Sequence, residues 1–74
     1  MFPIGIQVTC MIQALISLNG GETFIVDGKA KGRVVGIEDQ ATLIVNFSEY
    51  AESKGYLGKY NRELVFQKDC VPMF

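Results

Sequence analysis

The first eighteen residues alternate between apolar and polar positions. Every even position from 2 to 18 is apolar, whereas polar side chains occur at Gln7, Thr9, Gln13 and Ser17. A period of two is typical of a half-buried β-strand. A helix over residues 9–18 is the alternative, because apolar residues of this stretch also share one helical face. The β-branched content favours the strand.

Five further strands are predicted downstream, each short and bounded by turn residues. They cover residues 22–26, 33–37, 41–47, 63–67 and 71–74. The expected turns are Asn19-Gly20, Asp27-Gly28 and residues 38–40, since Asn, Asp and Gly accept the backbone angles of tight turns.

Two short helical elements interrupt the strands. Residues 48–53 are typical of one helical turn capped by Ser48, and residues 68–70 of a short 3₁₀ turn. Small sheets must curl to bury one face and limit their edges. We therefore expect one all-β domain over residues 1–74, a small barrel of five to six short antiparallel strands with one short helical turn.

The apolar positions of these strands define the expected core. Hydrophobic residues make up 49% of the chain, enough to fill a tight core and to leave apolar surface for a partner or a second copy. The expected core residues are Ile6, Val8, Phe24, Val26, Val34, Ile37, Leu43, Val45, Phe47, Leu64, Phe66 and Val71.

The segment 26–47 resembles the SH3-like small barrels, including the KOW-type modules. Its glycine turn leads into a strand of the form G-x-V-x-x-I at residues 32–37, and a second strand ends V-x-F at residues 45–47. Residues 64–73 are similar to the end of these barrels, where a 3₁₀ turn separates the last two strands. The resemblance, which covers residues 26–74, implies a small barrel but no single ligand, because members bind peptides, methylated lysines, RNA, DNA or ribosomal partners.

A second segment pair is similar to the carbon-storage-regulator family, whose members are strand-swapped RNA-binding dimers. The similarity lies in residues 21–26, which include a G-E-T start, and in residues 43–46. The chain departs from that family because it lacks the basic first strand and the basic C-terminal segment.

The sequence contains few of the residues that catalytic and metal-binding sites use. The chain has no histidine, which excludes Ser-His and Cys-His nucleophiles and imidazole metal sites. Cys10 and Cys70 are too few for a structural zinc site. We expect them to be small buried apolar side chains, although one disulfide remains open. We therefore expect no enzyme, no cofactor and no metal.

The formal net charge of −1 provides no bulk cationic field for nucleic acid or anionic lipid. The apolar N-terminal stretch is interrupted by polar residues, falls short of a membrane span and lacks a basic leader with a cleavage site. We expect mature structure there, a cytoplasmic protein and no membrane partner.

Residues 50–62 are the first candidate binding region, because aromatic and basic side chains interleave there. The candidate partner-binding residues are Tyr50, Tyr56, Tyr60, Lys54, Lys59 and Arg62. Rings beside cations suit nucleic acid and protein hot spots alike; the tyrosines could also simply cover the open end of the core. A second basic strip, Lys29, Lys31 and Arg33, favours nucleic acid if it shares a face with this region.

We expect a non-enzymatic protein-interaction module, such as an accessory or inhibitor protein of the phage or mobile-element type that docks on a larger protein. One alternative is a KOW-type RNA- or DNA-binding module that uses both groups of basic residues. Another is a structural homo-oligomer, with the apolar N-terminal strand as an exchangeable edge.

Overall fold

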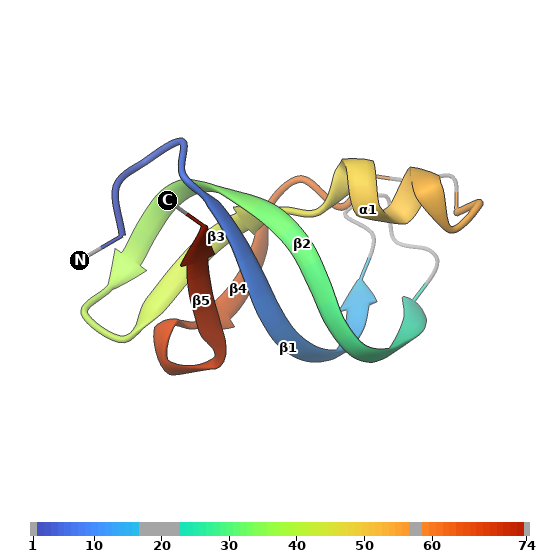
Figure 1. Cartoon of the computed structure of the whole chain (residues 1–74), viewed down its shortest axis with the longest axis horizontal. Coiled ribbons are helices and arrows are strands. Elements are labelled where there is room, and N and C mark those ends of the chain that lie inside the picture. Colours follow the sequence, from blue (N-terminus) through green and yellow to red (C-terminus); the bar gives the residue numbers. More distant parts are fainter. Residues whose placement is uncertain (1, 17–22, 57–58, 74) are drawn as a thin grey trace.

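Five antiparallel strands form one sheet in the described part of this protein. The computed structural model describes residues 2–16, 23–56 and 59–73, with side chains described at all of these except 16 and 23–27. The sheet order is β4-β3-β2-β1-β5 (Figure 1), and a helix and a 3₁₀ turn complete the fold. The elements are β1 (Gln7–Ile16), β2 (Thr23–Asp39), β3 (Thr42–Asn46), α1 (Ser48–Ser53), β4 (Glu63–Phe66), η1 (Gln67–Asp69) and β5 (Cys70–Met73).

The predicted all-β class, with one short helical turn, is confirmed by this arrangement. The bounds of α1 agree with the prediction, and η1 begins one residue earlier than the predicted 3₁₀ turn. The predicted turn at Asn19-Gly20 lies outside the described residues.

The N-terminal alternation belongs to a strand, so the helix alternative is wrong for the described part of residues 9–18. β1 pairs with β2 along its length and with β5 over residues 7–10. β1 therefore lies between two strands over residues 7–10, whereas its residues 11–16 pair with β2 alone among the described strands. The exchangeable edge that the homo-oligomer hypothesis assumed is thus covered over residues 7–10. The edges of the sheet are β4 and β5.

β2 is one long bent strand, whereas the sequence predicted two strands separated by a turn at Asp27-Gly28. Gly28 has a φ of +107°, a conformation that glycine tolerates best, and the β1–β2 register shifts nearby, between Ile12 and Ala14. The glycine therefore makes a bulge that bends the strand without reversing it. The bend curls the sheet until β4 approaches β1 (Figure 1).

The core lies inside this curl. Predicted core residues that are buried include Val8, Val34, Leu43, Val45 and Phe47, and Ile6 is half-buried against them. Phe24 and Val26, two more of the expected core residues, are among the residues whose side chains the structure does not describe. Further buried residues, which the list of expected core residues did not include, are Leu15, Ala30, Ala51, Tyr60 and Val65, together with the two cysteines that were expected to be buried, Cys10 and Cys70.

Four core predictions are wrong. The exposed side chains are Ile37, Leu64, Phe66 and Val71. In β4 the register places Val65 opposite the buried Leu43, so the neighbours of Val65 point outward. Val71 is the register partner of Thr9 and lies on the outer face of the sheet with it. A register shift between Val34 and Gly36 breaks the alternation of faces before Ile37, whose side chain is exposed.

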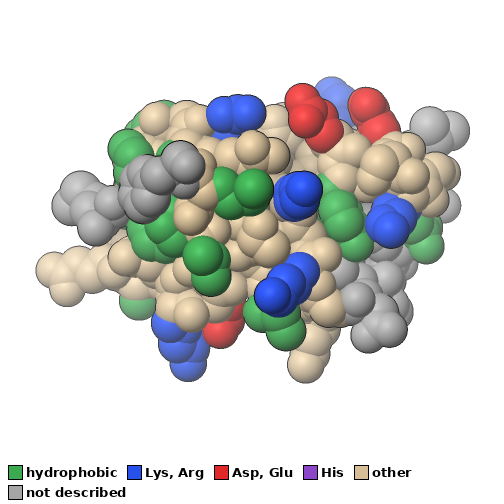
Figure 2. All heavy atoms as spheres, in the orientation of Figure 1, with side chains coloured by type: hydrophobic (Ala, Val, Ile, Leu, Met, Phe, Trp, Pro, Cys, Tyr) green, Lys and Arg blue, Asp and Glu red, His purple; other side chains and the backbone are tan. Residues whose placement is uncertain are grey.

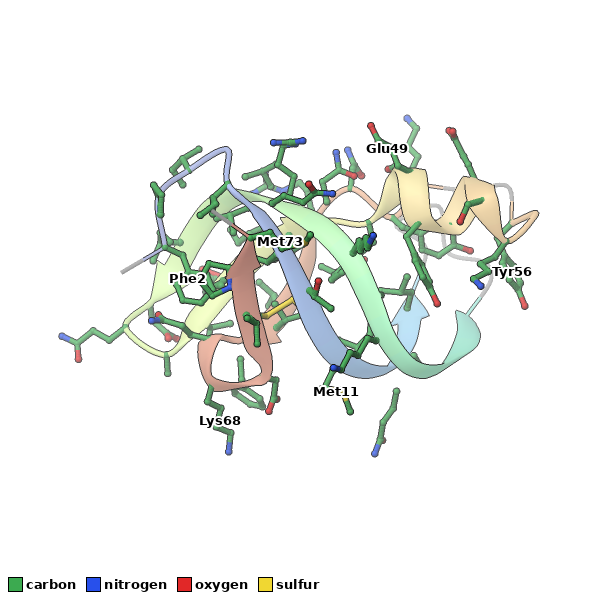
Figure 3. The ribbon with its side chains drawn as sticks, viewed as in Figure 1. Phe2, Met11, Glu49, Tyr56, Lys68 and Met73 are labelled. Carbon is green, nitrogen blue, oxygen red and sulfur yellow. A yellow bond between two sulfur atoms is a disulfide. The ribbon has the colours of Figure 1, made fainter. Side chains whose placement is uncertain are left out.

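Cys10 and Cys70 lie opposite each other in the β1–β5 pair and are joined by a disulfide, visible in Figure 3. Both are buried, as expected from the sequence, which had left their pairing open. The bond connects the last strand to the first.

Candidate functional site

The basic strip lies on the outer face of β2. Lys29, Lys31 and Arg33 are exposed, whereas Ala30 and Gly32 between them are buried. Alternate residues of a strand lie about 6.6 Å apart on one face, so the three cations form one row. Figure 2 shows Lys and Arg side chains spread over the face that β1 and β2 present, while acidic side chains gather mainly over α1.

One line of polar side chains crosses this row at Arg33. Gln7 of β1 is the register partner of Arg33, and Asn46 of β3 is its partner on the other side. The Arg33 Nη1 donates a hydrogen bond of 2.7 Å to the carbonyl oxygen of Gly5, which orients the guanidinium. A guanidinium has five N–H donors, so further donors remain for a ligand.

α1 is placed beside this line by the residues that join it to β3. The Asn46 Oδ1 accepts a 2.9 Å hydrogen bond from the Ser48 N–H, and the buried Phe47 donates its N–H to the carbonyl of Tyr60 at 2.8 Å. The predicted Ser48 cap is wrong, because Phe47 is the N-cap residue and makes no side-chain cap bond.

A pocket of about 250 Å³ opens where β1, β2, β3 and α1 meet. Two cationic side chains and one carboxylate line it, together with amide, hydroxyl and phenol groups. The lining residues are Gln7, Lys31, Gly32, Arg33, Asn46, Glu49, Tyr50 and Ser53. Hydrogen-bond donors and acceptors, positive charge and an aromatic ring are therefore available in one concave place.

The tyrosines do not act as one exposed group. Tyr50 lines the pocket and is half-buried against the core, and the Lys54 Nζ lies 5.6 Å from its ring centroid. Tyr56 is also half-buried against the core, and Tyr60 is completely buried within it. The Tyr60 ring is therefore a core side chain, and among the three tyrosines Tyr50 is the one that lines the pocket.

The structure thus joins the two predicted groups in part. Lys31 and Arg33 of the basic strip share the pocket with Tyr50, with Lys54 next to the ring. Lys29 lies farther along the same face of β2. Lys59 and Arg62 are exposed but do not line the pocket.

Four polar or charged lining residues were missed by sequence reasoning: Gln7, Asn46, Glu49 and Ser53. Asn46 carried a usable signal, since an asparagine two residues before a helical segment often bonds its first amides. Gln7 carried none, because its position depends on the register of β1 with β2.

The described residues offer neither a membrane-spanning helix nor a metal-binding cluster. No described helix has the length and apolar character needed to cross a membrane. No group of three or more His, Cys, Asp or Glu side chains in the described parts could hold a metal ion. The chain matches no protein-family model, no curated protein and no solved structure.

Proposed function

We propose that this protein is a non-enzymatic binding module of the SH3-like small-barrel type whose polar pocket binds single-stranded nucleic acid. The observation that carries the proposal is that Tyr50 of α1 lines one pocket with Lys31 and Arg33 of β2. A ring beside cations can stack on a base while the cations contact phosphates. We rank this ligand above a protein at this surface because cations, and not an apolar patch, share the pocket with the ring.

The topology supports the barrel type. The last strand returns to pair with the first, and η1 separates β4 from β5. The 3₁₀ turn between the last two strands is the feature that the resemblance to SH3-like barrels implied for the C-terminal part of the chain.

The row of cations favours one strand over a duplex. Lys29, Lys31 and Arg33 follow a single line along β2, which suits one phosphate backbone. At the end of this line the pocket offers the amides of Gln7 and Asn46, groups that can pair with the polar edges of an unstacked base. Because the net charge is −1, binding depends on this local row.

The pocket supports binding without catalysis. Its titratable lining groups are Lys31, Arg33, Glu49 and Tyr50, with no thiol or imidazole among them. One carboxylate beside two cations does not make an acid–base pair.

Fluorescence anisotropy with labelled single-stranded RNA, single-stranded DNA and a duplex of the same sequence, at low salt, tests the proposal. We expect the single strands to bind more tightly than the duplex. Comparison of the single-stranded RNA with the single-stranded DNA shows whether the protein prefers ribose or deoxyribose. Dissociation constants no better than about 10⁻⁴ M for every probe, the weak end of non-specific binding, would refute it.

Substitutions locate the binding. Lys31→Gln should weaken it, and Tyr50→Leu should weaken it by roughly fivefold to a hundredfold, since stacking contributes about 1–3 kcal/mol per base. Lys68→Gln is the matched control, because Lys68 is exposed on η1 and does not line the pocket. Circular dichroism checks the fold of Tyr50→Leu, since Tyr50 also packs against the core.

A cytoplasmic location is part of the proposal. Reducing compartments keep cysteines as thiols, whereas oxidising compartments preserve disulfides. The structure has Cys10 and Cys70 joined, so a cytoplasmic location requires that this bond be reduced in the cell. If it is reduced there, both cysteines should be alkylated when cells are lysed in denaturant with an alkylating agent and the protein is weighed by mass spectrometry. An unmodified, fully paired protein would contradict the cytoplasmic location and leave the ligand proposal standing.

A further inference from the structure

A second, larger concavity lies at the seam where the curled sheet brings β1 near β4. Its volume is about 920 Å³, and it is lined mainly by residues 11–15 of β1 and 63–66 of β4. β5 pairs with β1 over residues 7–10, and β4 pairs with β3 alone among the described strands. The groove therefore follows two strand segments that no described strand covers on the groove side.

Apolar side chains form much of the lining of this groove. Among them Leu15 and Val65 are buried, while Met11, Leu64 and Phe66 expose 54%, 59% and 57% of their surface. Three large apolar side chains exposed around one groove are unusual for a protein that stays alone in water, and such patches mark interaction sites. The core prediction had assigned Leu64 and Phe66 to the interior.

The charged side chains that line the groove are all negative among the described residues. Its lining includes four carboxylates and, among the described residues, no Lys or Arg. The carboxylates are those of Glu38, Asp39, Glu63 and Asp69. The chain's own Lys68 lies just outside, with its Nζ 5.8 Å from the Phe66 ring centroid. Figure 3 shows Lys68 and Met11 both pointing away from the sheet at the same edge of the view.

We infer that this groove binds a segment of a partner protein that carries large apolar side chains flanked by Lys or Arg. Apolar side chains of the segment cover Met11, Leu64 and Phe66, and its cations face the carboxylates. Complementary charge selects this occupant over an acidic or neutral segment. Lys68 beside Phe66 is an example, within the chain, of a cation on this ring.

This inference stands apart from the nucleic-acid proposal, because the groove and the pocket share no lining residue. Either site can therefore be altered while the other stays intact.

Three labelled ten-residue peptides test the inference. They share the same leucines and phenylalanine and differ in flanking residues, which are Lys, Ser or Glu. Binding is followed by anisotropy and by amide chemical shifts of the isotope-labelled protein. We expect the Lys peptide to bind most tightly, the Glu peptide least, and the shifts to fall on residues 11–15 and 63–66.

Variants separate charge from apolar contact. Glu38→Gln with Asp69→Asn should weaken the Lys peptide about threefold to tenfold, as expected for two exposed ion pairs, and leave the Ser peptide unchanged. Leu64→Ser should weaken both peptides. Val71→Ser is the control, because Val71 is 65% exposed and lies outside the groove.

The inference is overturned if the Lys and Glu peptides bind equally, if no peptide binds, or if the shifts map to the Lys31–Tyr50 pocket. It is also overturned if sedimentation shows a dimer that Leu64→Ser dissociates, because the occupant would then be a second copy of the chain.

Discussion

Cys70 lies directly opposite Cys10 in the β1–β5 pair, with the two Cα atoms 4.1 Å apart and the sulfur atoms bonded. The bond closes a loop across a sequence separation of 60 residues. Such a cross-link restricts the unfolded chain, which stabilises the folded state by about 2–4 kcal/mol.

The first prediction concerns this bond. The double substitution Cys10→Ala with Cys70→Ala should lower the free energy of unfolding by about 2–4 kcal/mol, measured by urea denaturation of the oxidised protein. Wild-type protein in reducing agent should unfold close to the double variant. Equal midpoints for oxidised wild type and variant would show that the bond does not stabilise the fold.

A second prediction follows from the close approach of β2 to the core at Gly32. A Cβ at this position would lie 2.5 Å from the Val45 Cγ1 and 2.8 Å from the Phe47 ring. Gly32→Ala should therefore cost about 1–3 kcal/mol through overpacking, measured by urea denaturation. Gly36→Ala is the milder control, since its nearest atom would be the Ile44 Cδ1 at 3.2 Å. Equal losses at both positions would contradict this account.

A third prediction tests which side chains of β4 face the core. Val65→Ala should destabilise the protein by about 2 kcal/mol, because it removes buried carbon atoms and leaves a cavity. Leu64→Ala should change stability by less than about 0.5 kcal/mol, because that side chain is 59% exposed. The reverse order in thermal or urea unfolding would show that Leu64 faces the core.

The fourth prediction concerns acid stability. The Asp39 carboxylate accepts a hydrogen bond from the Ala41 N–H at 2.8 Å, which lowers the pKa of Asp39 below its ordinary value of 3.8. A lowered folded-state pKa adds stability that is present above the ordinary pKa and is lost as pH falls through the folded-state pKa. Asp39→Ala should therefore be less stable than wild type at pH 7, with the difference shrinking below pH 3.8.

Asp39→Asn is the control for that experiment. Its amide oxygen can still accept the Ala41 N–H but cannot titrate, so the variant should keep part of the stability and lose the contribution of Asp39 to the pH dependence. A constant difference between wild type and Asp39→Ala from pH 7 to pH 2 would sink the prediction.

The fifth prediction uses salt to count phosphate contacts. If Lys29, Lys31 and Arg33 contact one strand, the logarithm of the binding constant should fall with the logarithm of salt concentration with a slope of about −2. Lys29→Gln should reduce that slope by about 0.7. A slope unaffected by Lys29→Gln would confine phosphate contact to the pocket.

Local elements were largely predictable from the sequence. The period of two across β1 predicts a strand because successive side chains of any strand point to opposite faces, and the β-branched run of β3 is typical of strands. The helix α1 was predicted from the short polar segment after β3. At Gly28 the sequence predicts a turn and the structure has a bend, because a glycine at positive φ serves both a turn and a bulge and the neighbouring strand decides between them.

The candidate site was predictable in its residue types and less so in its grouping. Lys31, Arg33 and Tyr50 were all selected from the sequence, and they line one pocket. Tyr60 was selected for the same reason as Tyr50 but is buried. An aromatic ring beside a lysine carries no local signal that distinguishes a core position from a surface position.

The amino-acid sequence by itself determined that this protein is a small, mostly β chain with no histidine for catalysis or metal binding. The residue content is a property of the sequence alone, and the alternation of apolar and polar residues that predicts strands involves only neighbours along the chain. The tertiary structure alone decided that Val65 points inward while Leu64 and Phe66 point outward, and that Gln7 and Asn46 flank Arg33. Those outcomes depend on the register between strands, which hydrogen bonds and core packing set across the sheet.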